Sequence, residues 1–179
     1  MGGAGRWRGG TGLGMAYVPH DAPVPITIQT LAHGVAFPNN QGLAGGYPGG
    51  TIHYQMQRGS RIAEVFAEGR IPTSPADVGG TEEALDFKGI SAQEASDVLF
   101  VRTSSSGGYG DPLDREPERV AVDVLDGYVT AETAGRIYGV VLDNGQVDLA
   151  ATEKTRAGLL EERRRRARKG EGSWAWHDA

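Results

Sequence analysis

The chain has 179 residues, of which 39% are hydrophobic, and this length is enough for one compact domain or for a domain with an appendage. It contains no cysteine, which excludes disulfides and thiolate metal sites and suits a reducing cytoplasm, where we expect the protein to act. The net charge of −5 gives no overall attraction to nucleic acid, and the absence of a long apolar run predicts no membrane span and no membrane partner.

The first 112 residues are rich in glycine and in short strand patterns. Glycine accounts for 28 residues, against a typical usage of roughly 7%, and clusters at 1–14, 42–50, 79–80 and 107–110. These clusters indicate tight loops, because glycine permits positive φ and close backbone approach. Alternation and β-branched residues predict strands at 15–18, 24–31 and 51–56, with 62–66 as a further candidate. Pro25 places the second strand at a sheet edge or at its own beginning.

Residues 70–97 are broken up by prolines and glycines, and 91–96 fit a single helical turn. The next stretch, 97–102, carries four apolar residues in a row and predicts a short buried strand. It leads into the glycine-rich loop at 107–110.

Helical patterns dominate after residue 112. Pro117 begins a helix with an apolar stripe of Val120, Val124 and Leu125, and Gly127 follows its end. Thr130 is a good N-cap for a second helix that Gly139 ends, and 140–142 with the turn at 143–145 predict a short strand. A third, mostly solvated helix runs from Asp148 to about residue 168.

The predicted fold class is therefore α+β, a glycine-rich β-dominated unit followed by a small helical C-terminal segment. We divide the chain into a β-rich unit at 1–112, a helical segment at 113–169 and a flexible tail at 170–179.

Several local blocks resemble, in their order, those of the hydantoinase B/oxoprolinase family, which includes N-methylhydantoinases, 5-oxoprolinases and the acetone and acetophenone carboxylases. The blocks are GAGRWRGGTG at 3–12, GLAGGYPG at 42–49, GGYGDP at 107–112, DREPERV at 114–120, DGYVT at 126–130 and YGVVL at 138–142. The chain departs from the family at 104–106, where three serines replace glycines, and at 75–95. These departures leave hydantoin, oxoproline and ketone substrates all open.

The resemblance implies a component, either the C-terminal portion or a small subunit, of a multi-subunit ATP-dependent hydantoinase/oxoprolinase-type amidohydrolase or ketone carboxylase. The implied partners are larger hydantoinase A-type and B-type subunits or domains. The resemblance also implies that ATP and a divalent metal, if the complex uses them, are bound by other parts of the complex. This chain alone would then bind no cofactor and lack a complete active site. A non-catalytic assembly module is the alternative.

Two candidate sites stand out, although no residue has a catalytic role that the sequence identifies. The first is a candidate ligand or interface loop, whose backbone amides are able to bind an anion. The favoured interpretation is that this loop is a structural turn. Its residues are Gly107, Gly108, Tyr109, Gly110 and Asp111. The second is an anion or interface contact made by Arg6, Trp7 and Arg8, in which two guanidinium forks flank an aromatic ring.

The remaining motifs predict no further site. His20, His33, His53 and His177 lack metal-ligand spacing, so we expect no metal site within this chain. The basic run at 163–169 is the main feature in favour of a nucleic-acid binder. Its aromatic neighbours follow the run without interleaving, so we interpret it as a solvated helix end and do not expect nucleic acid as a partner.

Overall fold

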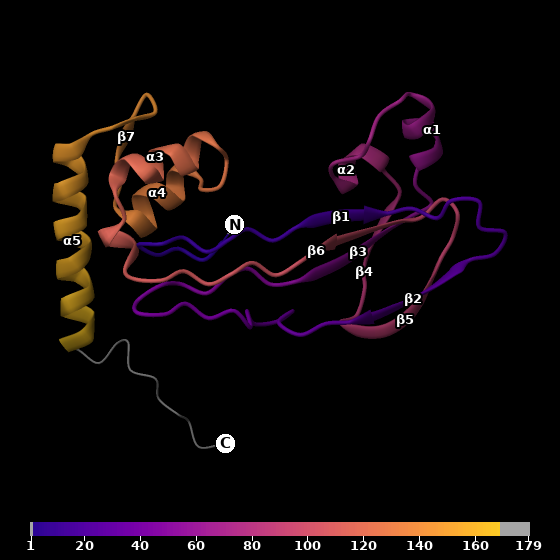
Figure 1. The fold of residues 1–179 in the computed structure, drawn as a ribbon, viewed down its shortest axis with the longest axis horizontal. Helices are drawn as coiled ribbons and strands as arrows, with labels where there is room; N and C mark the ends of the chain where they lie inside the picture. The colour runs from indigo at the N-terminus through magenta and orange to yellow at the C-terminus, as the bar shows by residue number, and fades with distance from the viewer. Residues whose placement is uncertain (1, 169–179) are drawn as a thin grey trace, which may run out of the picture.

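The computed structural model describes residues 2–168 and contains an antiparallel four-stranded sheet (Figure 1). The strand order is β1-β6-β3-β4, made by β1 (Gly14–Tyr17), β6 (Val98–Arg102), β3 (His53–Arg58) and β4 (Thr81–Ala84). β6 lies between two partners, and its first two residues are buried, which explains why its apolar run does not alternate. The strands predicted around residues 15, 51 and 97 are thus confirmed.

A separate two-stranded ribbon pairs β2 (Ile26–Leu31) with β5 (Lys88–Gln93). Pro25 directly precedes β2, as expected for a residue that cannot donate a backbone hydrogen bond to a ladder. The helical turn predicted at 91–96 is wrong, because 91–93 continue β5 and pair with β2. The chain reverses just afterwards, where the amide of Asp97 donates to the carbonyl of Glu94 at 3.0 Å.

The strand predicted at 62–66 is also wrong, because this stretch forms helix α1 (Ile62–Ala67). Ile62 and Val65, three residues apart, are buried together against Val98 and against Val78 of α2 (Pro75–Val78). A spacing of three places both side chains on one face of a helix, whereas it would place them on opposite faces of a strand.

Between the sheet and the C-terminal helices lies a set of extended segments at 2–6, 9–13, 40–43, 46–50 and 103–110, which we call the glycine bundle (Figure 1). Backbone packs against backbone in this bundle. A Cβ on Gly3 would lie 2.3 Å from the carbonyl oxygen of Tyr47, and one on Gly9 would lie 2.1 Å from that of Ser106. The bundle therefore requires glycine at these contacts, since no larger residue fits the spacing.

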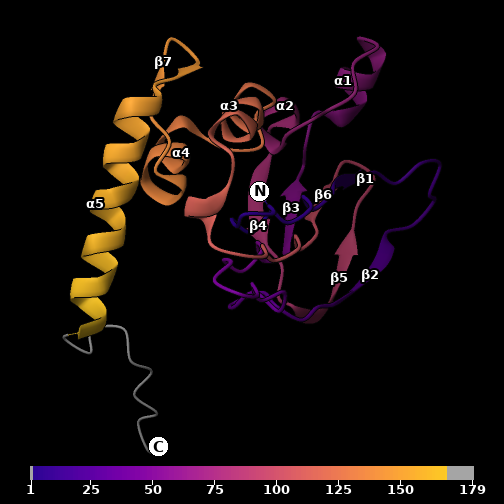
Figure 2. The same cartoon turned by 60° about the vertical axis from the view of Figure 1, so that its left-hand side comes forward.

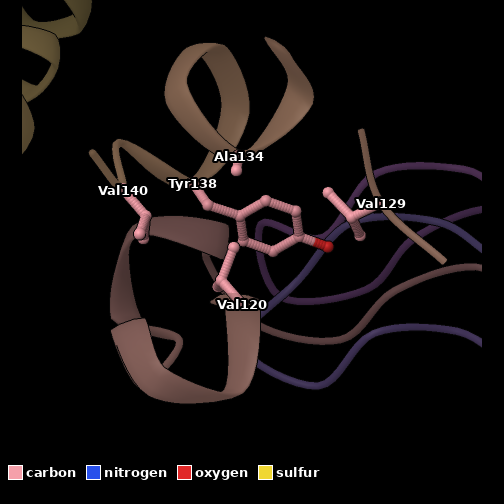
Figure 3. Packing of buried hydrophobic residues seen from close by; sticks show 5 residues of the cluster. All are labelled: Val120, Val129, Ala134, Tyr138 and Val140. Carbon is pink, nitrogen blue, oxygen red and sulfur yellow. The ribbon is translucent and has the colours of Figure 1, made fainter. Parts of the chain in front are cut away.

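The C-terminal part begins with the 3₁₀ turn η1 (Pro112–Asp114) and packs helices α3 (Pro117–Leu125) and α4 (Ala131–Tyr138) around Tyr138. Figure 3 shows the Tyr138 ring surrounded by apolar side chains from both helices and the loops that follow them, namely Val120, Val129, Ala134 and Val140. Thr130 caps α4 and Gly139 ends it with φ of 63°, as predicted.

Two details of this region differ from the sequence prediction. Leu125 is 86% exposed, because the buried stripe of α3 consists of Val120 and the partly buried Val124. The strand predicted at 140–142 is shifted to β7 (Leu142–Asp143), which pairs with β8 (Gln146–Val147) across a turn at Asn144 and Gly145. Val140 is instead buried in the core beside Tyr138.

Helix α5 (Leu149–Arg168) stands at the outer edge of the molecule, away from the sheet (Figure 2). Asp148 caps it, as predicted, by accepting a hydrogen bond from the amide of Ala151 at 2.9 Å. Strands followed by helices confirm the α+β class. The predicted tail at 170–179 lies outside the described residues, and within those residues no helix combines the length and apolarity needed to cross a lipid bilayer.

Candidate functional site

The two candidate segments that the sequence singled out lie side by side in the glycine bundle. Trp7 and Tyr109 exchange two backbone hydrogen bonds of 2.9 Å, and the amide of Arg6 donates to the carbonyl of Gly110 at 3.2 Å. Leu43 forms a further backbone bridge with Tyr109 on its other side. Residues separated by about a hundred positions in the chain thus form one surface.

The backbone amides of the glycine loop are largely used inside the bundle. The amide of Gly108 donates to the carbonyl of Tyr47, and that of Gly110 donates to the carbonyl of Leu43, both at 2.9 Å. The amide of Tyr109 donates to the backbone carbonyl of Trp7, also at 2.9 Å. Since these three donors already have protein partners, an anion at this loop would have to be held by other groups.

The side chains on this surface point to solvent. The exposed fractions are 53% for Trp7, 55% for Tyr109 and 66% for Leu43, and the guanidinium of Arg119 lies 5.8 Å from the Trp7 ring. We call Trp7, Leu43 and Tyr109 the aromatic patch. Exposed tryptophan and tyrosine beside arginine are typical of protein–protein interfaces, because large rigid rings bury much area at little entropic cost.

Arg8 is engaged within the protein. Its Nε lies 3.3 Å from a carboxylate oxygen of Asp123, and its guanidinium stacks 4.7 Å from the Tyr128 ring. Asp123 also pairs with Arg115 at 2.8 Å, with both side chains 9% exposed, and Arg115 donates to the backbone carbonyl of Arg6 at 3.0 Å. This ionic network joins the glycine bundle to helix α3.

Asp111 connects the glycine loop to two elements. Its carboxylate accepts a hydrogen bond from the amide of Leu113 at 2.9 Å, which caps η1, and pairs with Arg163 of α5 at 2.8 Å. Arg156 of α5 donates to the carbonyls of Tyr138 and Arg115, and burial lowers its pKa. Part of the basic helix is therefore held against the protein by arginine contacts.

Tyr138 lies where the helical core meets the glycine bundle, since Ala4 packs against its cluster. Burial raises the pKa of the Tyr138 hydroxyl, and the nearby charge of Arg115 opposes the shift. The Tyr138 hydroxyl therefore stays protonated at physiological pH, and the side chain serves as a neutral core residue.

Sequence reasoning missed two adjoining cavities, of about 460 and 670 Å³, that share Gly12 and Arg102. The smaller lies between the glycine bundle and α4 and includes Arg136, while the larger includes His53 of β3. Burial, and then the positive charge of Arg102, lowers the pKa of His53. No sequence signal links Arg102 to Arg136, because they lie on a strand and a helix that only the tertiary structure brings together.

The described residues include no group of three or more histidine, aspartate or glutamate side chains placed to hold a metal ion. His53 contacts a hydroxyl instead, with its Nε2 2.9 Å from Oγ1 of Thr51. Of the predicted histidines, His177 lies outside the described residues.

Comparison with known proteins identifies one family. The model of the hydantoinase B/oxoprolinase family matches residues 1–112. The acetophenone carboxylase delta subunit of Aromatoleum aromaticum is 35% identical over 177 residues, which cover 92% of this chain and 26% of that protein.

Two solved structures are also similar. Nucleotide-free acetone carboxylase matches 90% of this chain and 24% of its own, with a TM-score of 0.72 and 30% identity. The ATP-dependent caprolactamase from Pseudomonas jessenii matches 87% of this chain and 24% of its own, with a TM-score of 0.59 and 28% identity. The chain thus spans about a quarter of the length of the relatives it matches.

Proposed function

Because the chain belongs to the hydantoinase B/oxoprolinase family, we propose that it is a component of a multi-subunit ATP-dependent enzyme of the amidohydrolase or ketone carboxylase kind. The observation that carries this proposal is its similarity along nearly its whole length to a subunit of acetophenone carboxylase. Of the two solved structures, acetone carboxylase has the higher TM-score, which favours a carboxylase over a cyclic-amide hydrolase.

In this proposal the chain corresponds to the C-terminal portion of a B-type component, or to a small subunit, in the cytoplasm. Its partners are a larger B-type part and an A-type subunit. ATP and a divalent metal are bound by those partners, and the active site is completed outside this chain.

The aromatic patch provides a contact surface for such partners. Alanine at Trp7 or Tyr109 is expected to weaken assembly by about 30-fold, because buried aromatic anchors contribute about 2 kcal/mol or more to an interface. Phe37 is 80% exposed and lies outside the patch, so Phe37→Ala is the matched control. Equal affinity of the Trp7→Ala and Phe37→Ala variants for the partners, measured by calorimetry, would remove the patch from the interface.

The proposal as a whole is tested by purifying the complex from the native source and identifying its members by mass spectrometry. We expect an A-type subunit and a larger B-type part among them. ATP-dependent turnover of the complex is then measured with and without this chain. Loss of turnover while the remaining subunits stay assembled supports an enzyme component. Unchanged turnover with impaired assembly supports a non-catalytic assembly module, and a complex that assembles and turns over normally without the chain contradicts both.

A further inference from the structure

The cavity between the glycine bundle and α4 has a cationic lining. Arg102 at the end of β6 and Arg136 in the last turn of α4 both line it. The chain has 23 acidic and 18 basic residues, yet neither this cavity nor the adjoining one includes an aspartate or glutamate among its lining residues. The local charge is therefore opposite in sign to that of the whole protein.

The two arginines lack the carboxylate partner that several other arginines of this chain have. Arg8, Arg58, Arg115 and Arg163 each pair with a carboxylate. Within residues 2–168, neither Arg102 nor Arg136 forms an ion pair. Both residues are exposed, and two positive charges on the lining of one cavity raise the local positive potential, which favours a negatively charged ligand.

The rest of the lining suits a small polar ligand. Thr51 and Thr133 provide hydroxyl groups, and the glycine walls let a ligand approach the backbone closely. Guanidinium groups match the planar or tetrahedral oxygens of carboxylates and phosphates with paired hydrogen bonds. We propose that Arg102 and Arg136 bind one oxyanion, a carboxylate or a phosphate group, in this cavity.

His53 provides a direct reporter of such binding. It is the cross-strand partner of Arg102 in the β3–β6 pairing and lines the adjoining cavity, which shares Arg102. Burial lowers the pKa of His53, and the positive charge of Arg102 lowers it further. An anion beside Arg102 compensates that charge and therefore raises the pKa of His53.

The experiment titrates the full 179-residue chain with inorganic phosphate and, separately, with succinate, at constant ionic strength held with chloride. Binding is followed by NMR through the backbone amides of the cavity and the ring protons of His53. We expect saturable shifts and a higher His53 pKa in the bound state. The probe that binds more tightly identifies whether the oxyanion is a phosphate or a carboxylate.

Two variants and a control assign the site. Arg102→Gln and Arg136→Gln are each expected to raise the dissociation constant by about tenfold or more, since each removes one charge-assisted contact. Arg164→Gln removes an exposed arginine of α5 outside both cavities and should leave binding unchanged. The proposal is overturned if neither probe gives saturable shifts, or if all three variants weaken binding equally. The test needs only this chain, so its result does not depend on the proposed function.

Discussion

Gly108 provides a sharp test of the backbone packing in the glycine bundle. An alanine Cβ at this position would lie 2.1 Å from the carbonyl oxygen of Ala4, whereas ordinary contacts begin at 3.4 Å. Gly108 and the segment around Ala4 would have to move apart by about 1.3 Å. The nearest atoms belong to backbone, which cannot rotate away as a side chain can.

The expected cost of Gly108→Ala has two parts. Overpacking costs about 1–3 kcal/mol. The movement also stretches two hydrogen bonds, from the amide of Gly108 to the carbonyl of Tyr47 at 2.9 Å and from the amide of Leu43 to the carbonyl of Gly108 at 3.0 Å. Each lost bond costs about 1 kcal/mol, so the free energy of unfolding should fall by about 4 kcal/mol.

Urea unfolding of the full chain, followed by circular dichroism, measures this loss. Gly10→Ala is the matched control, because Gly10 lies in the same bundle but its Cβ would meet only the hydroxyl of Ser106, at 3.8 Å. We expect that control to change the free energy of unfolding by less than about 1 kcal/mol. Equal effects of the two substitutions would refute the claim that the bundle requires glycine because of close backbone contacts rather than because of glycine's conformational freedom.

Three further predictions concern the ionic contacts and α5. Asp123→Ala should lower the free energy of unfolding by about 3 kcal/mol, because it leaves the buried Arg115 and the partly buried Arg8 without a counter-charge. Glu116→Gln in an exposed pair should cost less than about 1 kcal/mol, and similar urea midpoints for the two variants would contradict this expectation. Burial alone would raise the pKa of Asp97, but hydrogen bonds from the amides of Glu94 and Gly59 and from Arg58 hold it below its usual value. The stabilisation by this carboxylate is present above its unfolded-state pKa and is lost as pH falls through the lower folded-state pKa, so the urea midpoint should drop below about pH 4, and less steeply in Asp97→Asn. A pH profile identical in that variant would exclude Asp97 as a cause. Gly158→Ala should raise the helical signal of α5 and stabilise the chain by about 0.5–1 kcal/mol, because a Cβ there meets no other atom; a decrease in stability would show an unrecognised contact.

Local sequence signals predicted the elements whose structure depends on local chemistry. Thr130 and Gly139 delimit α4, Asp148 caps α5, and the turn at Asn144 and Gly145 joins β7 to β8. The apolar run of β6 correctly indicated a short buried strand. The errors at 62–66 and 91–96 arose where short stretches fit both a helix and a strand, and packing against Val98 or pairing with β2 decided between the two.

The partners of the candidate residues became clear only in the folded structure. The chain itself could not show that Arg8 shares Asp123 with Arg115, or that Asp111 pairs with Arg163, since these contacts join segments far apart in sequence. It also could not reveal the cavities around Arg102 and Arg136.

The sequence by itself determined where tight glycine loops lie, where most of the strands and helices lie, and which family the ordered blocks resembled. These properties depend on residues close together in the chain, so their patterns can be read locally. Only the tertiary structure decided what the glycines contact, which charges are paired and which are left facing a cavity. Those outcomes depend on distances between remote segments, and such distances are set by the packing of the whole bundle against the helical core.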